Sequence, residues 1–309
     1  MITILFAAGD HNWPVYEPLL AEALKERGIA ATLTRSAMPE DVDYIIYAPS
    51  SPLQDFRPFT RCKAVMNLWA GVERIVGNET LTQPLTRMAD TSLREGMCEW
   101  VAGHVLRHHL GLDRYIVAPE PSWQQIAPPL ARDRKVTVLG LGELGMACAV
   151  TLAGLGFDVT GWSRSPKEAE GIRCLSGEAG LETALRGADI AVLLLPLTAA
   201  TENLMNDERL GWLAPGAALL NPGRGALIDD CALLAALDSG ALGHATLDVF
   251  RVEPLPADHP FWAHPKVTVT PHIASETRPT TASAFIADNI RRSEAGEPLL
   301  NVVDRALGY

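Results

Sequence analysis

The stretch from Lys135 to Arg164 constrains the fold of this chain more than any other. Residues 136–139 are apolar and β-favouring, and Gly140, Gly142 and Gly145 follow them in the spacing Gly-x-Gly-x-x-Gly. A helix over 146–155 and a second strand over 158–162 are expected next. Strand, glycine turn and helix in this order predict a dinucleotide-binding unit. Its turn and the amides at the helix start would face a pyrophosphate.

The residues after the second strand indicate which dinucleotide binds. An NAD site usually carries Asp or Glu about 20 residues beyond the glycines, where the carboxylate accepts the ribose hydroxyls. Here the strand ends in Ser163, Arg164 and Ser165. Because a guanidinium pairs with phosphate and hydroxyls can donate to it, these residues predict NADP(H) as the preferred cofactor, with NAD(H) possible.

Composition limits the function classes. With 309 residues, 48% hydrophobic and 20% charged, the chain is long enough for two globular domains. Its formal net charge of −11 argues against a general affinity for nucleic acid or acidic membrane. The first ten residues are expected to form a strand rather than a signal peptide, and no apolar run reaches membrane-spanning length. Five cysteines without a C-x-x-C pair fit a reducing cytoplasm.

Strands and helices alternate along the rest of the chain, which predicts doubly wound parallel sheets. A long helix over 93–112 is expected to link two domains, and 117–134 to form an irregular connector. The remaining expected strands are 2–6, 30–34, 42–47, 64–68, 189–195, 217–220, 245–249 and 267–270, and the remaining helices are 15–26, 181–186, 207–212, 229–239 and 279–294.

Two further features have a functional and a structural interpretation. The strand at 64–68 runs into Ala70, Gly71 and Val72, where a helix start could present amides to a substrate carboxylate or could be an ordinary turn. His104 and His108 lie four residues apart on the long helix, a spacing that can hold a metal. Because no third ligand is evident nearby, these histidines are interpreted as structural and no metal is predicted.

Polar residues follow three of the expected strands, at the edge where ligands of such sheets bind. Arg224 stands between two glycines after 217–220, and Glu253 lies in a proline-stiffened loop after 245–249. His272 follows 267–270, which is expected to be a central strand. Taken alone, each residue also has an interpretation without function: a surface arginine, a loop glutamate and a buried structural histidine.

Together with a nicotinamide, these three side chains suggest reversible hydride transfer to a 2-oxo acid. Arg224 would hold the substrate carboxylate and polarise the carbonyl, and His272 would donate the proton. Glu253 would fix the imidazole tautomer and favour its charged form.

The chain resembles the D-2-hydroxyacid dehydrogenase family nearly end to end. The similarity is carried by LWAGVE, VLGLGELG, LLLPLTAATENLMN, LLNPGRGALID, LDVFRVEPLP and FWAHPKVTVTPHIAS. Within the family it is most similar to the glyoxylate/hydroxypyruvate reductase A group, through WSRS, SETRPTTA and the ending VDRALGY.

The resemblance implies two similar α/β domains, a substrate-binding domain from 1–98 plus 276–309 and a dinucleotide-binding domain over 99–275. It implies a homodimer, NADPH-dependent reduction of glyoxylate and hydroxypyruvate, and Arg224, Glu253 and His272 as the catalytic set. Asp248 matches a position that orders the active site. The implied substrate contacts are Ala70, Gly71, Val72 and Arg278, and the implied cofactor contacts are Gly140, Gly142, Glu143, Leu144, Gly145, Ser163, Arg164, Ser165, Leu195, Pro196, Asn221, Pro222, Gly223 and Asp248.

Two departures and two alternatives accompany this interpretation. Pro222 replaces a residue that is often Ala, Thr or Ile, and Glu143 would have to point its charge away from the pyrophosphate. A larger 2-oxo acid is an alternative substrate, because the pocket walls decide it. A non-catalytic dinucleotide-sensing regulator on the same fold is the alternative from another class.

Overall fold

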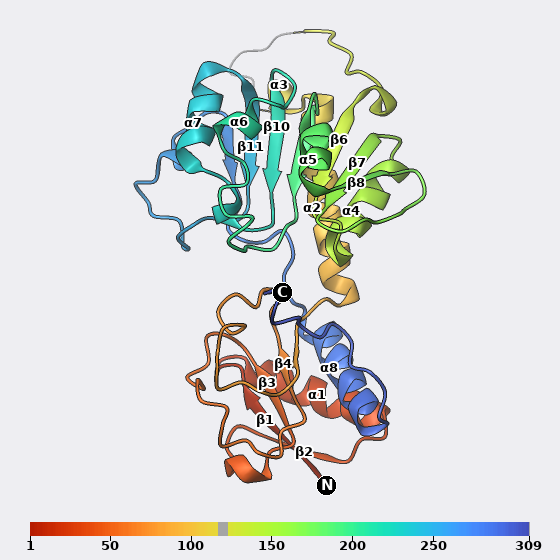
Figure 1. Cartoon of the computed structure of the whole chain (residues 1–309), viewed down its shortest axis with the longest axis vertical. Helices are drawn as coiled ribbons and strands as arrows, with labels where there is room; N and C mark the ends of the chain where they lie inside the picture. The colour runs from red at the N-terminus through yellow and green to blue at the C-terminus, as the bar shows by residue number, and fades with distance from the viewer. Residues whose placement is uncertain (117–122, 309) are drawn as a thin grey trace. The chain divides into compact units, whose positions relative to one another are not determined.

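A computed structural model describes residues 1–116 and 123–308 and divides the chain into two compact units (Figure 1). Unit 1 combines residues 1–93 with 277–309, and unit 2 comprises residues 94–276. Each unit is built on its own parallel sheet. The predicted fold class, two parallel-sheet α/β domains of which the first is discontinuous, is confirmed. The predicted connector falls partly on 117–122, outside the described residues.

Unit 1 contains a five-stranded sheet in the order β2-β1-β3-β4-β5, with every neighbouring pair parallel. Helices α1 and α8 lie side by side and share one apolar core on one face of this sheet (Figure 1). The elements are β1 Ile2–Ala7, α1 Trp13–Glu26, β2 Ala31–Thr34, η1 Pro39–Asp41, β3 Tyr44–Tyr47, β4 Ala64–Asn67, β5 Leu85–Thr86 and α8 Pro279–Glu294.

The opposite face of the unit 1 sheet is covered by irregular chain, and the helix predicted after β4 is absent there. Ile45, Tyr47 and Val65 point to that face and pack against residues of the irregular stretch between β3 and β5. No helix follows β4 there, because only one turn forms, with the amides of Ile75 and Val76 both donating to the carbonyl of Val72. The expected strand-to-helix junction at residues 69–73 is therefore a loop and a turn.

Unit 2 contains a seven-stranded sheet in the order β12-β11-β10-β9-β6-β7-β8, again parallel throughout. The strand order reverses between β6 and β9, and ligands of doubly wound sheets bind at such a switch point. The elements are α2 Thr91–Leu110, α3 Asp113–Ile116, η2 Ala131–Asp133, β6 Lys135–Leu139, α4 Glu143–Gly154, β7 Asp158–Ser163, β8 Arg173–Ser176, α5 Gly177–Leu185, β9 Ile190–Leu193, α6 Asp207–Leu210, β10 Ala217–Asn221, η3 Gly225–Leu227, α7 Asp230–Ser239, β11 Leu242–Leu247, η4 Pro260–Trp262 and β12 Val267–Val269.

Three details of unit 2 differ from expectation. Helix α4 begins at Glu143 rather than at 146, because Gly142 is its N-cap. Strand β8 was not anticipated. Strand β12 lies at the edge of the sheet and is not central, and its residues are only partly buried. The sequence VTV is equally compatible with either position, because β-branched residues suit any pleated surface.

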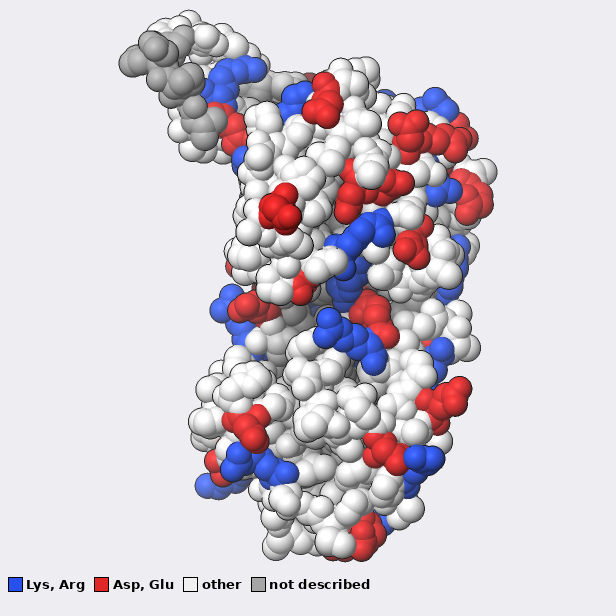
Figure 2. Space-filling model, turned by 90° about the vertical axis from the view of Figure 1, so that its left-hand side faces the viewer, with Lys and Arg blue, Asp and Glu red and all other residues white. Residues whose placement is uncertain are grey.

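The surface charge is mixed. On the face drawn in Figure 2, acidic and basic side chains alternate over a largely uncharged surface. Within residues 1–116 and 123–308, no helix combines the length and the apolar character that a membrane span requires.

Candidate active site

The glycine turn joins β6 to α4 at the switch point of the unit 2 sheet. Gly140 has φ +106°, and a Cβ there would lie 2.5 Å from the carbonyl oxygen of Leu194. A Cβ on Gly145 would lie 1.7 Å from the carbonyl oxygen of Gly140. A Cβ on Gly142 would meet no atom within 4 Å. The turn therefore packs tightly against the protein at Gly140 and Gly145 and leaves free space at Gly142. A pyrophosphate could approach there, beside the first amides of α4.

Glu143 places a carboxylate at the start of α4. Its Oε1 lies 3.9 Å from Nη1 of Arg94 on α2, and both side chains are about half exposed. Such a loose surface pair contributes little stability. It does offset the negative charge beside the proposed pyrophosphate position. Leu144, by contrast, packs its side chain against the apolar core of the unit.

The residues after β7 form a tight turn. Ser163 is buried, and its hydroxyl donates to the carbonyl oxygen of Ser165 at 2.7 Å. Arg164 and Ser165 are exposed. Ser163 thus orients the turn in this structure, and the basic side chain of Arg164 is the group at the surface that could contact a 2′-phosphate.

Asn221 shapes the loop that carries Arg224. This fully buried side chain donates from Nδ2 to the carbonyl oxygen of Arg224 at 2.8 Å and accepts from the amide of Gly223 at 3.1 Å. A Cβ on Gly225 would lie 2.1 Å from the carbonyl carbon of Phe250. The loop after β10 therefore packs directly against the backbone after β11, and glycine is required at that contact.

Residues of two neighbouring loops hold the imidazole ring of His272 in place. Nδ1 of His272 lies 2.7 Å from Oε2 of Glu253, whose Oε1 accepts from the amide of Phe250 at 2.8 Å. The His272 side chain is 54% exposed and that of Glu253 is 35% exposed, so the imidazole is accessible while the carboxylate is anchored. With Nδ1 held by a carboxylate, Nε2 is the nitrogen that can serve a substrate.

Asp248 orders the loop that carries His272. Its carboxylate is almost fully buried and accepts from the hydroxyl of Thr270 at 2.5 Å and from the amides of Ile273 and Ala274 at 2.9 and 2.8 Å. The amide of His272 donates to the carbonyl oxygen of Asp248, and His272 adopts φ +56°. A non-glycine residue at positive φ persists only where its surroundings fix it. Thr270 was not anticipated, since a hydroxyl after a strand carries no special signal.

Leu195, Pro196 and Pro222 belong to the same edge of the unit 2 sheet. Leu195 and Pro222 are buried, and the carbonyl oxygen of Pro196 accepts from the Thr201 hydroxyl at 2.7 Å. They follow β9, which pairs with β6 at the switch point, and β10, which pairs with β9. The contacts of these residues with a cofactor stay a prediction.

The loop predicted to bind the substrate carboxylate lies in unit 1. Asn67 is buried, and its Nδ2 donates to the carbonyl oxygens of Trp69 and Gly71 at 2.9 and 3.0 Å. Val72 is buried, whereas Ala70 and Gly71 are half-buried. Among hydrogen bonds between described residues, none has the amide of residues 70–72 as its donor. A loop held by its carbonyls with its amides unused suits an anion. Arg278, also in unit 1, is the exposed N-cap residue of α8.

Comparison with known proteins identifies the family. The family described as "D-isomer specific 2-hydroxyacid dehydrogenase, NAD binding domain" matches residues 102–274, which is more than half of the chain. The chain belongs to the D-isomer specific 2-hydroxyacid dehydrogenases. This confirms the resemblance seen in the sequence.

Individual dehydrogenases and reductases are similar over most of their length. A glyoxylate/hydroxypyruvate reductase A from Serratia proteamaculans is 41% identical over 257 residues, which cover 81% of this chain and 82% of that protein. A D-isomer specific 2-hydroxyacid dehydrogenase from Xanthobacter autotrophicus, solved with NADPH and MES, is 42% identical with a TM-score of 0.92 and 99% coverage of both chains. An NADPH-dependent glyoxylate/hydroxypyruvate reductase from Sinorhizobium meliloti, solved with NADP and sulfate, is 32% identical with a TM-score of 0.84, covering 100% of this chain and 99% of that one.

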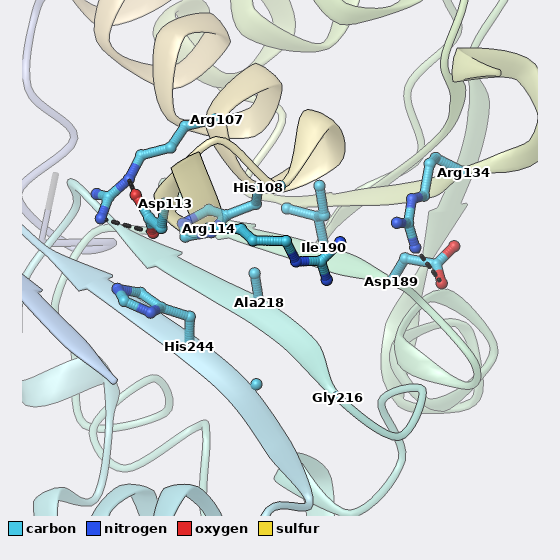
Figure 3. Close-up of a pocket in the computed structure, with 12 residues that line it drawn as sticks. Arg107, His108, Asp113, Arg114, Arg134, Asp189, Ile190, Gly216, Ala218 and His244 are labelled. Carbon is cyan, nitrogen blue, oxygen red and sulfur yellow. Dashed lines mark hydrogen bonds and ion pairs between the residues drawn. The ribbon is translucent and has the colours of Figure 1, made fainter. Parts of the chain in front are cut away.

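This dehydrogenase also has a cavity at the opposite edge of the unit 2 sheet, near the amino ends of β9, β10 and β11. The cavity has a volume of about 270 Å³ (Figure 3). Arg107 is paired with Asp113 at 2.6 Å, and beside this pair the rings of His108 and His244 have centroids 5.0 Å apart. Nε2 of His108 lies 2.9 Å from the Thr246 hydroxyl, and Nε2 of His244 lies 2.8 Å from the Thr268 hydroxyl.

The two histidines noted on the long helix, His104 and His108, contact neighbouring side chains of unit 2. The rings of His104 and Trp100 contact each other in a tilted arrangement with centroids 4.4 Å apart, and Nε2 of His108 is hydrogen-bonded with the hydroxyl of Thr246. Among the residues that the structure describes, no group of three or more His, Cys, Asp or Glu side chains is arranged to hold a metal ion.

The two histidines of the cavity are expected to make the folded protein less stable in acid. Burial lowers the pKa of His108 to about 3 and that of His244 to about 4, from about 6.5 in an unfolded chain. The rings stay neutral in the fold while the unfolded chain gains protons, so the free energy of unfolding falls as pH drops from about 6.5 toward 4. At pH 5 the expected loss is on the order of 2 kcal/mol per ring.

Urea unfolding at pH 7 and pH 5 measures this loss. His244→Gln should lose less stability than the wild type between the two pH values, because one of the two rings is removed. The exposed His11→Gln variant, as a matched control, should follow the wild type. Equal losses in the wild type and His244→Gln would contradict the assignment.

Proposed function

We propose that the protein reduces small 2-oxo acids with NADPH, converting glyoxylate to glycolate and hydroxypyruvate to glycerate. The observation that carries the proposal is the hydrogen bond between His272, in the loop after β12 that Asp248 orders, and Glu253, in the loop after β11. Strand β11 pairs with β10, the strand that leads to Arg224. The names of the relatives from Serratia proteamaculans and Sinorhizobium meliloti support the same activity.

Each of the three side chains has a distinct task in this proposal. NADPH, when bound, supplies the hydride. Arg224 holds the substrate carboxylate through its planar fork and stabilises the charge that develops on the carbonyl oxygen. His272 donates a proton to that oxygen from Nε2, and Glu253 orients the ring through Nδ1. In the oxidative direction the same imidazole accepts the proton.

The two units have separate tasks in this proposal. Unit 2 is the dinucleotide-binding domain, because it contains the glycine turn, the exposed Arg164 and the open side of Gly142. Unit 1 is the substrate-binding domain, because the amides of residues 70–72 suit a carboxylate and Arg278 is an exposed cation.

A single assay tests the proposed activity. Purified protein is mixed with NADPH and glyoxylate, and separately with hydroxypyruvate, pyruvate, 2-oxoisovalerate and phenylpyruvate. The absorbance of the reduced nicotinamide should fall fastest with the first two substrates. Faster turnover of a branched or aryl substrate would move the preference to larger 2-oxo acids. Absence of turnover with every member would overturn the proposal.

Arg164 is expected to determine the cofactor preference. Arg164→Ala removes the guanidinium proposed to contact the 2′-phosphate, so kcat/KM for NADPH should fall about tenfold to a hundredfold while that for NADH changes little. Initial rates at saturating glyoxylate measure both values. Lys167→Ala, which removes another exposed cation of the same turn, is the matched control. An equal fall with both cofactors would contradict this role.

A homodimer in the cytoplasm is part of the proposal. The resemblance implies packing through the dinucleotide-binding domain, and unit 2 exposes apolar side chains at Tyr115, Ile116, Trp123 and Leu130. All five cysteines are free thiols, as is usual in a reducing compartment. Light scattering coupled to size-exclusion chromatography measures the mass, and a monomeric mass would contradict the dimer.

A further inference from the structure

Two cysteines of unit 2 lie next to each other. Cys98 on α2 and Cys148 on α4 have their sulfur atoms 3.9 Å apart, with the thiol of Cys148 donating toward Cys98. Cys98 is half-buried and Cys148 is fully buried. Among the described residues this is the one hydrogen bond between two thiols.

The two helices form a stable frame for this pair. Met97 and Val101 of α2 pack in the same apolar core as Ala149 and Leu152 of α4, on one face of the unit 2 sheet (Figure 1). The sulfur atoms of a disulfide lie about 2.05 Å apart, so each sulfur would have to move by about 1 Å. A change of that size is within reach of side-chain rotation with a slight adjustment of the helices.

The surroundings give the two thiols different reactivity. The hydrogen bond from Cys148, with a contribution from the positive charge of Arg94, lowers the pKa of Cys98 to about 6. The same hydrogen bond, together with burial, raises the pKa of Cys148. Because the thiolate is the reactive form, Cys98 is the nucleophile near neutral pH, and Cys148 beside it stays a protonated thiol.

We propose that Cys98 and Cys148 are a peroxide-sensitive modification site that closes to a reversible disulfide. The Cys98 thiolate attacks hydrogen peroxide, so an S–O bond forms, the O–O bond breaks and hydroxide leaves, giving a sulfenic acid. Cys148 then gives up its proton and attacks the oxidised sulfur, so an S–S bond forms and water leaves. Two thiols and one peroxide become one disulfide and two waters, and an external dithiol reverses the change.

The position of Cys148 couples this modification to the dinucleotide turn. Cys148 lies on α4, and Gly145 of the same helix packs so tightly against Gly140 that a Cβ would be 1.7 Å from its carbonyl oxygen. Helix α4 cannot shift toward α2 without displacing the turn. The oxidised protein is therefore expected to bind NADPH at least threefold more weakly than the reduced protein. This consequence, unlike the disulfide itself, rests on the proposed function.

The experiment follows the chemistry and the affinity in the same sample. Reduced protein is treated with hydrogen peroxide, alkylated with iodoacetamide and digested without reduction, and NADPH affinity is measured by fluorescence before and after. The expected result is a linked pair of peptides containing Cys98 and Cys148, an intact mass that before alkylation is lower by two hydrogen atoms, and affinity restored by dithiothreitol. Reduced protein that does not bind NADPH would contradict the proposed function without affecting the mass result.

Variants separate the pair from the other thiols. Cys98→Ser should abolish both the linked peptides and the affinity change. Cys148→Ala, chosen because alanine is tolerated in a core, should prevent the linked peptides and leave any oxidised Cys98 as a sulfenic acid that dimedone labels. Oxidation of Cys98 should be slower in this variant than in the wild type, because the hydrogen bond from Cys148 is lost. Cys231→Ser, at an exposed cysteine on α7, should behave as wild type. The proposal is overturned if both Cys98 and Cys148 are still free thiols, and are alkylated, after peroxide treatment. It is also overturned if Cys98 is oxidised beyond the sulfenic acid while Cys148 stays a free thiol. An unchanged NADPH affinity in the disulfide form would overturn the coupling to the turn.

Discussion

Replacing His272 by alanine is expected to lower kcat for glyoxylate reduction about a hundredfold or more, while NADPH affinity changes little. The imidazole is the group positioned by Glu253 to give its proton to the carbonyl oxygen, and alanine removes that donor without touching the glycine turn. Stopped-flow or steady-state rates at saturating substrate measure kcat, and fluorescence titration measures NADPH binding.

Two further variants make the His272 result specific. Glu253→Gln keeps a hydrogen-bonding group beside Nδ1, but an amide can donate as well as accept and so fixes the ring tautomer less strictly than the carboxylate. Its kcat should therefore lie between those of the wild type and His272→Ala. His264→Gln changes a histidine before the amino end of β12, the opposite end of the strand that His272 follows, and should retain wild-type kcat. A His272→Ala enzyme with nearly wild-type kcat would remove the histidine from the mechanism.

Local chemistry made the glycine turn and the three strand ends predictable from sequence. Gly140 and Gly145 stand where a Cβ would strike a carbonyl, so the spacing itself encodes the packing. In a parallel sheet, residues that follow neighbouring strands meet at one edge, which is why Arg224, Glu253 and His272 could be grouped before any coordinates. The grouping required only that β10, β11 and β12 be neighbours, as they are.

Other features depend on contacts between distant segments and could not be predicted. The missing helix after β4 reflects the loop residues Phe56 and Leu81, which lie 16 residues before and nine residues after Val72 and pack with it on that face of the sheet. The cavity pairs His108 with His244, 136 residues later in the chain. In the same way Cys98 and Cys148 look unrelated in sequence, since no C-x-x-C spacing announces them.

The Arg224 loop shows how the backbone and side chain of one residue can be tested separately. Its carbonyl oxygen accepts from Nδ2 of Asn221, and its flanking glycines are required by packing. Substituting the side chain removes the hydrogen bond from its Nη1 to the carbonyl oxygen of Gly223 but leaves those contacts, which set the loop geometry. Arg224→Gln is therefore expected to fold normally and to lower kcat/KM for glyoxylate about a hundredfold to a thousandfold. Steady-state kinetics that resolve kcat from KM measure the effect.

The division of the Arg224 effect between kcat and KM decides the role of the guanidinium. A group that both holds the carboxylate and stabilises the developing oxyanion must affect kcat as well as KM, because only interactions that strengthen in the transition state accelerate the chemical step. Arg224→Lys keeps the charge but loses the planar fork, so it should recover part of the loss and mostly in KM. Arg186→Gln, at an exposed arginine paired with Glu182 on the surface of α5, is the matched control and should be silent. A rise in KM alone for Arg224→Gln would restrict Arg224 to anchoring the substrate. His272 would then be left as the one side chain that acts on the carbonyl oxygen.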